Sequence, residues 1–142
     1  MAFKEMDIHQ LQFNPFDKIS KQWMLVTAGD RMKSNTMTAS WGGVGIMWGK
    51  PVVTAYIRPQ RYTKEFVDGS DRFTISFLPG DKREALNICG AVSGRDVEDK
   101  WEEAGLHPFY VNEKTLEETT AVEEAEMIFV CRKLYVQEMY PE

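Results

Sequence analysis

The chain has 142 residues, 43% of them hydrophobic and 27% charged, and a formal net charge of −5. Single hydrophobic cores usually occupy about 100–150 residues, so we expect residues 1–142 to form one domain. No apolar run approaches the roughly 20 residues that a membrane-spanning helix needs, so no membrane partner is expected. The acidic balance argues against a nucleic-acid partner, because phosphate backbones attract basic surfaces.

The N-terminal residues 1–7 are charged and lack the apolar core of a secretory signal, which favours a cytoplasmic protein. Cys89 and Cys131 form no Cys-x-x-Cys pair. In a reducing compartment they are interpreted as buried structural thiols rather than as a disulfide or a redox pair.

Short helical and extended signals open the chain. Asn14 before Pro15 is typical of an N-cap and first helical position, which predicts a helical turn through Ser20. Residues 23–28 read as a strand that a Gly29–Asp30 turn closes.

Two further strands are expected over residues 36–41 and 52–58, with the glycines of residues 42–45 and Gly49 making a turn between them. These glycines match neither a dinucleotide-binding nor a phosphate-loop pattern. The second strand ends in Arg58, which should emerge at a rim. On the first strand, alternation places Thr36, Thr38 and Ser40 on one face and Met37, Ala39 and Trp41 on the other.

The middle of the chain predicts a helix, a strand and two more helices. Thr63 is interpreted as the N-cap of a helix over 64–68, with Gly69 behind it. The strand 72–78 should turn Phe73, Ile75 and Phe77 inward. The later helices are expected to begin at Asp81, with an apolar stripe of Ala85, Leu86, Cys89 and Val92, and at Asp96, with Val97, Trp101 and Ala104 inward and Gly105 as its end.

The last third is expected to be an acidic loop over 112–126 with a short edge strand near 119–122, then a strand over 127–140. The apolar face of that last strand would carry Ile128, Val130, Leu134 and Val136. Many short strands with few helices predict a mainly β, closed or nearly closed barrel. The alternation of strands with long helices that a Rossmann fold needs is missing.

Cationic and hydroxyl side chains gather where the strand 52–58 meets the following helix. Arg58, Arg61 and Thr63 lie within six positions there. Guanidinium groups, hydroxyls and helix N-terminal amides are what a phosphate needs. Residues alone leave a second interpretation open, in which both arginines are solvated charges beside a helix cap.

Three motifs together resemble the flavin reductase-like family, flavoproteins that hold FMN in a split β-barrel. They are Asn35-x-Met37-Thr38-Ala39-Ser40-Trp41, Arg58-x-x-Arg61-Tyr62-Thr63 and Ser93-Gly94-Arg95-Asp96-x-x-Asp99-Lys100. The resemblance implies a mainly β split barrel with a few short helices, and a homodimer with flavin sites near the subunit interface.

The resemblance also implies site residues. The flavin ring would lie along the first motif and the phosphate at the second, with NAD(P)H as hydride donor. Trp41 has an alternative place in the core or a dimer interface, and Lys100 has one on the solvated face of its helix, which we slightly favour. The implied FMN-binding residues are Asn35, Met37, Thr38, Ala39, Ser40, Trp41, Arg58, Arg61, Tyr62, Thr63 and Lys100.

No acid, base, nucleophile or metal-ligand spacing stands out in the chain. His9 and His107 are far apart in sequence and have no metal-ligand spacing with either cysteine. That suits a flavoenzyme, because the cofactor carries the chemistry. We therefore expect an FMN-dependent NAD(P)H oxidoreductase, a flavin reductase. A flavoredoxin-like electron-transfer protein and a cofactor-free barrel used for subunit association are the alternatives.

Relatives in this family usually continue past the strand expected to end near Tyr140, whereas this sequence stops at Glu142. The domain is therefore expected to be a short member of the family or one that lacks a C-terminal tail.

Overall fold

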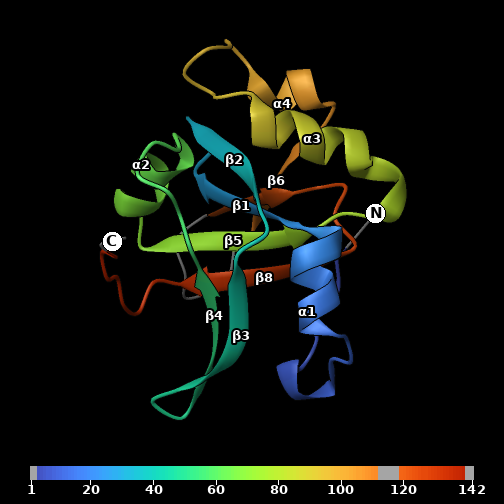
Figure 1. Ribbon diagram of the computed structural model, residues 1–142, viewed down its shortest axis with the longest axis vertical. Helices are drawn as coiled ribbons and strands as arrows, with labels where there is room; N and C mark the ends of the chain where they lie inside the picture. Colours follow the sequence, from blue (N-terminus) through green and yellow to red (C-terminus); the bar gives the residue numbers. More distant parts are fainter. Residues whose placement is uncertain (1–2, 112–118, 140–142) are drawn as a thin grey trace.

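The computed structural model describes residues 3–111 and 119–139, which form a mainly β structure with short helices (Figure 1). The strands are β1 Met24–Gly29, β2 Ser34–Ala39, β3 Gly42–Met47, β4 Lys50–Ala55, β5 Arg72–Phe77, β6 Pro108–Val111, β7 Thr119–Val122 and β8 Met127–Arg132. The helical segments are η1 Ile8–Gln10, α1 Pro15–Asp17, η2 Lys18–Gln22, α2 Thr63–Asp68, η3 Gly80–Lys82, α3 Arg83–Ala91 and α4 Lys100–Ala104.

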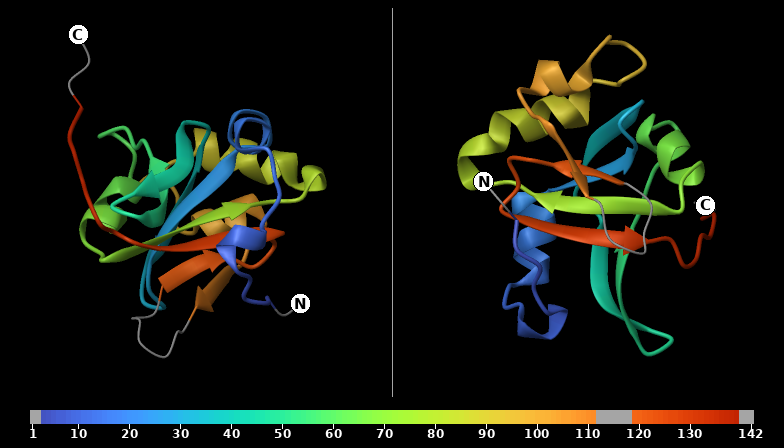
Figure 2. Two further views of the ribbon diagram at one scale, coloured as in Figure 1. Left: turned by 90° about the horizontal axis from the view of Figure 1, so that it is seen from below. Right: turned by 180° about the vertical axis from the view of Figure 1, so that it is seen from behind.

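An antiparallel four-stranded sheet in the order β2-β1-β5-β8 forms the centre, and β3–β4 and β6–β7 are separate hairpins. Figure 2 shows the β6–β7 hairpin behind this sheet, and the β3–β4 hairpin extends away from it as an arm. The expected mainly β class is confirmed. Among the described strands, the hydrogen bonds close no single continuous cylinder.

Each face of the sheet has its own core, because alternate residues point to opposite sides. On one face Met24, Val26 and Met37 pack with Ile75, Phe77 and Phe129, under the N-terminal segment, β4 and α2. On the other, Leu25 and Leu78 pack with α3, α4 and Val122. The inward residues expected on the strand 72–78 are confirmed for Ile75 and Phe77.

The polar face of β2 is also buried. Thr36 is fully buried, and its Oγ1 lies 2.9 Å from Oγ1 of Thr27 on β1. Thr74 of β5 donates to the carbonyl of Thr120 on β7. These three threonine hydroxyls can fill the interior because they bond one another or a backbone carbonyl, whereas the buried hydroxyls of Ser76 and Thr119 have no partner among the described residues.

The glycine-rich residues 42–45 belong to β3, so their interpretation as a turn is wrong. Gly42 pairs with Ala55. The hairpin turns at Trp48 and Gly49, whose φ angles are 53° and 71°, so the turn prediction is confirmed for Gly49 alone. A tight hairpin turn needs this left-handed backbone. A Cβ on Gly42 would lie 2.4 Å from the carbonyl oxygen of Thr54, which explains the glycine there.

Several predicted helix caps shift. Asn14 caps α1 through bonds to the amides of Phe16 and Asp17, as expected, and Gly105 ends α4 in the left-handed conformation. Asp99, and not Asp96, caps α4. Thr63 is the first residue of α2 and not its cap, and no side chain caps α3, so the Asp81 prediction is also wrong.

The C-terminal strand is shorter than expected, and both of its faces contact core residues. β8 ends at Arg132; Met127, Phe129 and Cys131 pack against the core under β4 and α2, while Ile128, on the predicted face, packs against the core beneath α3. Val130, Leu134 and Val136 are exposed, because the chain beyond Arg132 leaves the sheet. Tyr140 and residues 112–118 lie outside the described residues, but the strand expected near 119–122 is confirmed as β7.

Both cysteines are free, as expected, with Cys89 fully buried. Within the described ranges, no helix has the length and apolar character needed to cross a membrane.

Candidate functional site

The loop between β4 and α2 presents two arginines in different environments. Arg58 is exposed, and its guanidinium lies 4.7 Å from the ring centre of Trp41. Trp41 is 54% exposed, so it is not a core residue. Arg58 thus keeps donors available to a ligand while its position is steadied by a cation–π contact.

Arg61 is half-buried in the same loop. Its guanidinium donates to the carbonyl of Cys89 on α3, at 3.2 Å. Burial lowers the pKa of Arg61, and the positive charge of Arg58 lowers it further. Both effects disfavour positive charge here, so an anion would stabilise the loop.

Lys100 is the main correction to the sequence-based interpretation. It is only 5% exposed, so the solvated helix face we slightly favoured is wrong. α4 is a single short helix packed against α3, and Lys100 is its first residue. Burial lowers the pKa of Lys100 to about 8; the nearby Cys89 thiol opposes this shift, and Arg61 adds to it.

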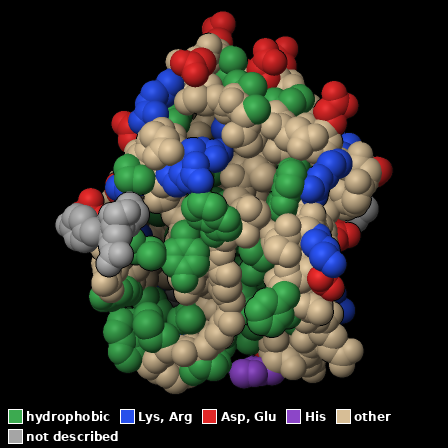
Figure 3. Space-filling model, in the orientation of Figure 1, with side chains coloured by type: hydrophobic (Ala, Val, Ile, Leu, Met, Phe, Trp, Pro, Cys, Tyr) green, Lys and Arg blue, Asp and Glu red, His purple; other side chains and the backbone are tan. Residues whose placement is uncertain are grey.

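The side chain of Lys100 has no hydrogen bond or ion pair with any residue in the described part of the chain. Neither Arg58 nor Arg61 pairs with a carboxylate within those residues. We call Arg58, Arg61 and Lys100 the unpaired cluster. Figure 3 shows Lys and Arg side chains beside a hollow on this face, between α2 and α3. Positive charge without a protein counter-ion is chemically suited to an anionic ligand.

β2 runs alongside this cluster but turns most of its side chains elsewhere. Met37 is buried and Ala39 packs against the same core. The hydroxyl of Thr38 donates to the carbonyl of Leu86 on α3. A Cβ on Gly90 would lie 3.4 Å from Cβ of Thr38, so α3 and β2 pack closely. The groups that β2 can offer a ligand are therefore mainly backbone groups, together with half-buried Ser40.

Asn35 and Thr63 join β2 to the start of α2. The Asn35 amide nitrogen donates to the Thr63 hydroxyl at 2.7 Å, and both residues are buried. Tyr62, beside them, is half-buried and packs edge-on against Phe66, with ring centres 5.0 Å apart. The bond between Asn35 and Thr63 fixes the loop of Arg58 and Arg61 relative to β2.

The loop after α3, which carries the third sequence motif, lies against Asn35 and Tyr62. A Cβ on Gly94 would lie 2.4 Å from Oδ1 of Asn35 and 2.9 Å from the Tyr62 ring. The motif named Gly94, but sequence reasoning missed its close approach to Asn35 and Tyr62 and the carbonyl of Cys89 as a partner of Arg61. Both contacts join chain segments far apart in sequence, so no local pattern signals the partners.

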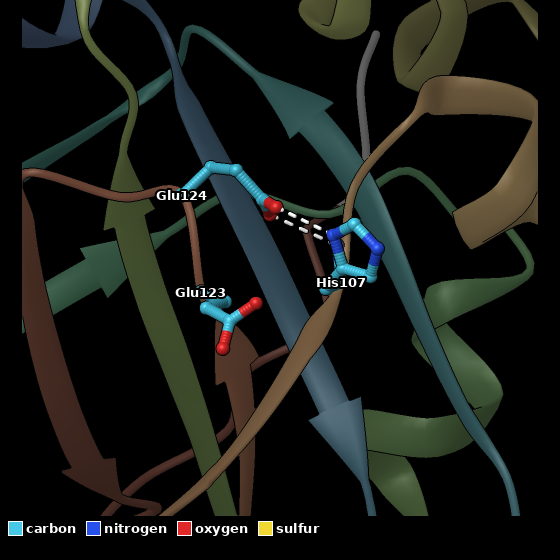
Figure 4. Close-up of side chains that lie close together, drawn as sticks. All are labelled: His107, Glu123 and Glu124. Atoms are coloured by element: carbon cyan, nitrogen blue, oxygen red, sulfur yellow. Dashed lines mark hydrogen bonds and ion pairs between the residues drawn. The ribbon is translucent and has the colours of Figure 1, made fainter. Parts of the chain in front are cut away.

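A second polar group lies near the turn between β7 and β8, away from the sequence-predicted residues. His107 faces Glu124 (Figure 4): Nδ1 lies 2.7 Å from Oε2, and the His107 amide donates to Oε1. Glu123 supplies a second carboxylate, and the ligand atoms of all three residues lie within 4.8 Å of one another. Since both oxygens of Glu124 are already bonded, we interpret this group as a structural tie between two turns.

Comparison with known proteins identifies the family. The flavin reductase like domain model matches residues 16–139. The comparison with curated proteins returns no match.

Solved structures with this fold include FMN-binding proteins. An FMN-binding domain of a flavin reductase-like enzyme from Shewanella baltica is 16% identical with a TM-score of 0.69, over 86% of this chain and 62% of that one. Flavoredoxin of Desulfovibrio vulgaris is 23% identical with a TM-score of 0.71, over 96% of this chain and 69% of its own.

A Shewanella frigidimarina structure, described as having a split barrel domain, is 20% identical with a TM-score of 0.69. It is matched over 98% of this chain and 71% of its own length. The chain thus spans about two thirds of the length of these proteins, and less than that of the first. The fold is that of the split barrels, and the chain belongs to the flavin reductase-like domain family.

Proposed function

We propose that this chain binds FMN, with the phosphate held by Arg58 and Arg61 and the flavin ring lying along the backbone of residues 37–41. The observation that carries the proposal is the unpaired cluster: three neighbouring cations, two of them half-buried or buried, without a carboxylate partner in the described residues.

The chemistry of the cluster fits this ligand. A terminal phosphate carries nearly two negative charges near neutral pH and accepts bidentate bonds from guanidinium groups. A buried ammonium group without partners is costly, and an electron-rich ligand edge would offset that cost. Lys100 suits the N1–C2 edge of the flavin, where negative charge gathers on reduction.

The remaining proposed residues form the walls and supports of the site. Asn35 and Thr63 hold the phosphate loop through their mutual bond, and Tyr62 packs beside them. Met37, Ala39 and Thr38 contribute backbone because their side chains point away. Ser40 and the exposed Trp41 would border the ring.

FMN, when bound, supplies the redox chemistry by accepting and releasing electrons. The chain's own residues then have to position the ring and a second reactant and to balance charge. We propose an NAD(P)H-dependent flavin reductase in the cytoplasm, where nicotinamide cofactors are available. The second candidate is an electron-transfer protein reduced by a partner, favoured by the fold shared with the Desulfovibrio flavoredoxin.

The test is to titrate purified protein with FMN and follow quenching of flavin fluorescence. Saturable 1:1 binding supports the proposal, and no binding at high micromolar FMN contradicts it. Loaded protein is then mixed with NADH or NADPH under anaerobic conditions. Rapid bleaching of the flavin absorbance supports the reductase, and no reaction with either donor supports the electron-transfer protein.

We also propose a homodimer, formed through the β3–β4 arm. Its Val44, Ile46 and Trp48 are exposed, and Trp48 packs edge-on against Tyr135 with ring centres 6.1 Å apart. Contiguous exposed apolar groups are typical of interfaces. Ile46→Glu should shift the sedimentation coefficient toward a monomer. The matched control is Met32→Glu at the exposed β1–β2 turn, which should leave it unchanged.

A further inference from the structure

Arg95 carries more contacts than a surface arginine normally makes. Its guanidinium donates to the carbonyl of Gln60 at 3.0 Å and forms an ion pair with Glu65. It also lies 4.8 Å from the ring centre of Tyr62. One side chain from the loop after α3 therefore contacts the loop of Arg58 and Arg61 and the first turn of α2.

Arg95 is itself held in place. Its amide donates to Ser93 Oγ at 3.1 Å, and the Asp96 amide donates to the Ser93 carbonyl at 3.0 Å. Gly94 lies so close to Asn35 and Tyr62 that a larger residue would displace them. The loop of residues 93–96 is thus seated against the residues that support the phosphate loop.

The loop that Arg95 contacts is also held at its ends, by the Arg58–Trp41 contact and the Asn35–Thr63 bond. The Arg61 amide donates to the Arg58 carbonyl at 3.1 Å, and the Arg61 guanidinium reaches Cys89. Gln60 lies between the two arginines, and its carbonyl accepts from Arg95. Fixing this carbonyl limits the positions that Arg58 and Arg61 can adopt.

We propose that Arg95 is a positioning residue that preorganises the phosphate-binding loop without contacting the phosphate. This inference rests on the proposed function, because it assigns Arg95 a part in that same site. The guanidinium is already engaged with Gln60 and Glu65, whereas Arg58 has no such bonds among the described residues. Preorganised binding groups lose less entropy when the ligand arrives.

The contacts of Arg95 with Gln60 and Glu65 limit how much its removal can change stability and FMN affinity. The side chains of Arg95 and Glu65 are 45% and 60% exposed, and exposed ion pairs contribute little to folding. We therefore expect a small change in thermal stability. Because these contacts are partly exposed, we expect an affinity change at the low end of the usual coupling range, about fivefold to tenfold.

The experiment measures the dissociation constants of FMN and riboflavin for the full chain and for three variants. Riboflavin lacks the phosphate, so it reports on ring binding alone. Arg95→Ala should weaken FMN binding about fivefold to tenfold and leave riboflavin binding unchanged. Arg132→Ala, on β8 at the opposite edge of the sheet from β2, is the matched control and should change neither.

Glu65→Gln separates positioning from direct contact. If Arg95 positions the loop through Glu65, this variant weakens FMN binding in the same direction as Arg95→Ala. If Arg95 instead binds the phosphate, removing the competing carboxylate strengthens FMN binding or leaves it unchanged, which overturns the inference. Glu65→Gln also keeps the test intact if Arg95→Ala fails to fold.

Two further results overturn the inference. One is unchanged FMN affinity in Arg95→Ala, and the other is equal weakening of FMN and riboflavin. If the unmodified chain binds both ligands equally, the proposed phosphate site fails and the positioning role fails with it. Failure of the phosphate site can be told apart from failure of the Arg95 role alone, because it is seen in the unmodified chain before any substitution is made.

Discussion

Two basic clusters lie near α3, and they differ in how their charges are balanced. Beside the helix's N-terminal end, Lys18 pairs with Glu126 and Lys21 with Asp17, while Arg83 donates to the carbonyls of Lys21 and Gln22 and stacks over Trp23. We call Lys18 and Lys21 the paired cluster; Arg83 beside them bonds only carbonyls among the described residues, as Arg61 does. Beside the other end, Arg58, Arg61 and Lys100 have no carboxylate partners within the described residues.

We propose, from this difference, that charge balance is a better guide to the ligand site than open volume. A cavity of about 520 Å³ lies beside the paired cluster and is lined by Leu78, Pro79 and Leu86 among others. The two lysines that line it already pair with carboxylates, so they offer little uncompensated charge to attract an anion. The unpaired cluster offers donors and uncompensated charge, and it coincides with the motifs that indicated FMN.

The largest effect is expected when both loop arginines are removed. Arg58→Ala with Arg61→Ala should weaken FMN binding by about 3 kcal/mol or more, roughly a hundredfold or greater, because charge-assisted bonds to the phosphate are lost. Fluorescence titration measures it. Riboflavin affinity should change little.

The matched control removes two cations from the paired cluster. Lys18→Ala with Lys21→Ala should leave FMN affinity within about twofold of the unmodified chain, since these side chains serve the local structure. If both double variants lose affinity equally, general electrostatic attraction explains binding and the distinction between the clusters disappears.

A smaller effect on FMN affinity, whose size depends on pH, is expected for Lys100. Its pKa is lowered from 10.5 to about 8, mainly by burial. It is therefore charged below about pH 8 and attracts an anionic ligand there, and this attraction is lost as the pH rises. FMN affinity of the unmodified chain should fall between pH 7 and pH 9.5, and Lys100→Met should bind about tenfold more weakly at pH 7 with a flatter profile.

The same substitution should affect folding in the opposite direction. Between about pH 8 and pH 10.5 the unfolded chain holds a proton on Lys100 that the folded chain releases, so the stability of the FMN-free protein rises with pH in this window. Lys100→Met removes a buried, unpartnered charge and should raise Tm at pH 7. A lower Tm at pH 7 would contradict our account of Lys100.

The smallest effect is a change in thermal stability that we expect on replacing His107, which forms an ion pair with Glu124. The hydrogen bond to Glu124 raises the pKa of His107 above 6.5. Burial alone would raise the pKa of Glu124, but its bonds from His107 lower it below 4.5. The stability that His107 contributes is present below pH 6.5 and is lost as the pH rises through the pKa of His107 in the folded chain. The stability that Glu124 contributes is present above pH 4.5 and is lost as the pH falls through the pKa of Glu124 in the folded chain.

The ion pair between His107 and Glu124 therefore contributes most to the free energy of unfolding between about pH 4.5 and pH 6.5. Tm of His107→Gln, compared with the unmodified chain, should show its greatest deficit near pH 5.5 and a smaller one near pH 9. FMN affinity should not change. A deficit that is constant across pH would mean that the ion pair is not what His107 contributes.

Local signals in the sequence were sufficient for much of the fold. Asn14 before Pro15 and Gly105 after a helix act through their own neighbours, and both predictions are confirmed. β3 was missed because its glycines have low strand propensity, and only pairing with β4 stabilises them as a strand. The Asp96 cap was displaced by Asp99 because residues 94–98 form turns before α4 begins.

The candidate site was only partly predictable, and Lys100 shows why. Its neighbours in sequence are acidic, which suggested a solvated helix face. In the structure α4 is short and packs on α3, so its first side chain is buried near Cys89 and Arg61. The burial of Lys100 thus depends on packing between segments that are distant in sequence. The Arg58 and Arg61 loop could be anticipated because both residues lie in one short segment.

The most direct test of the account compares FMN with riboflavin on the unmodified chain in matched titrations at pH 7. If the unpaired cluster grips the phosphate, FMN binds at least about a hundredfold more tightly than riboflavin, and added salt narrows this gap. Equal affinity for the two flavins would contradict the assignment of Arg58 and Arg61 to the phosphate.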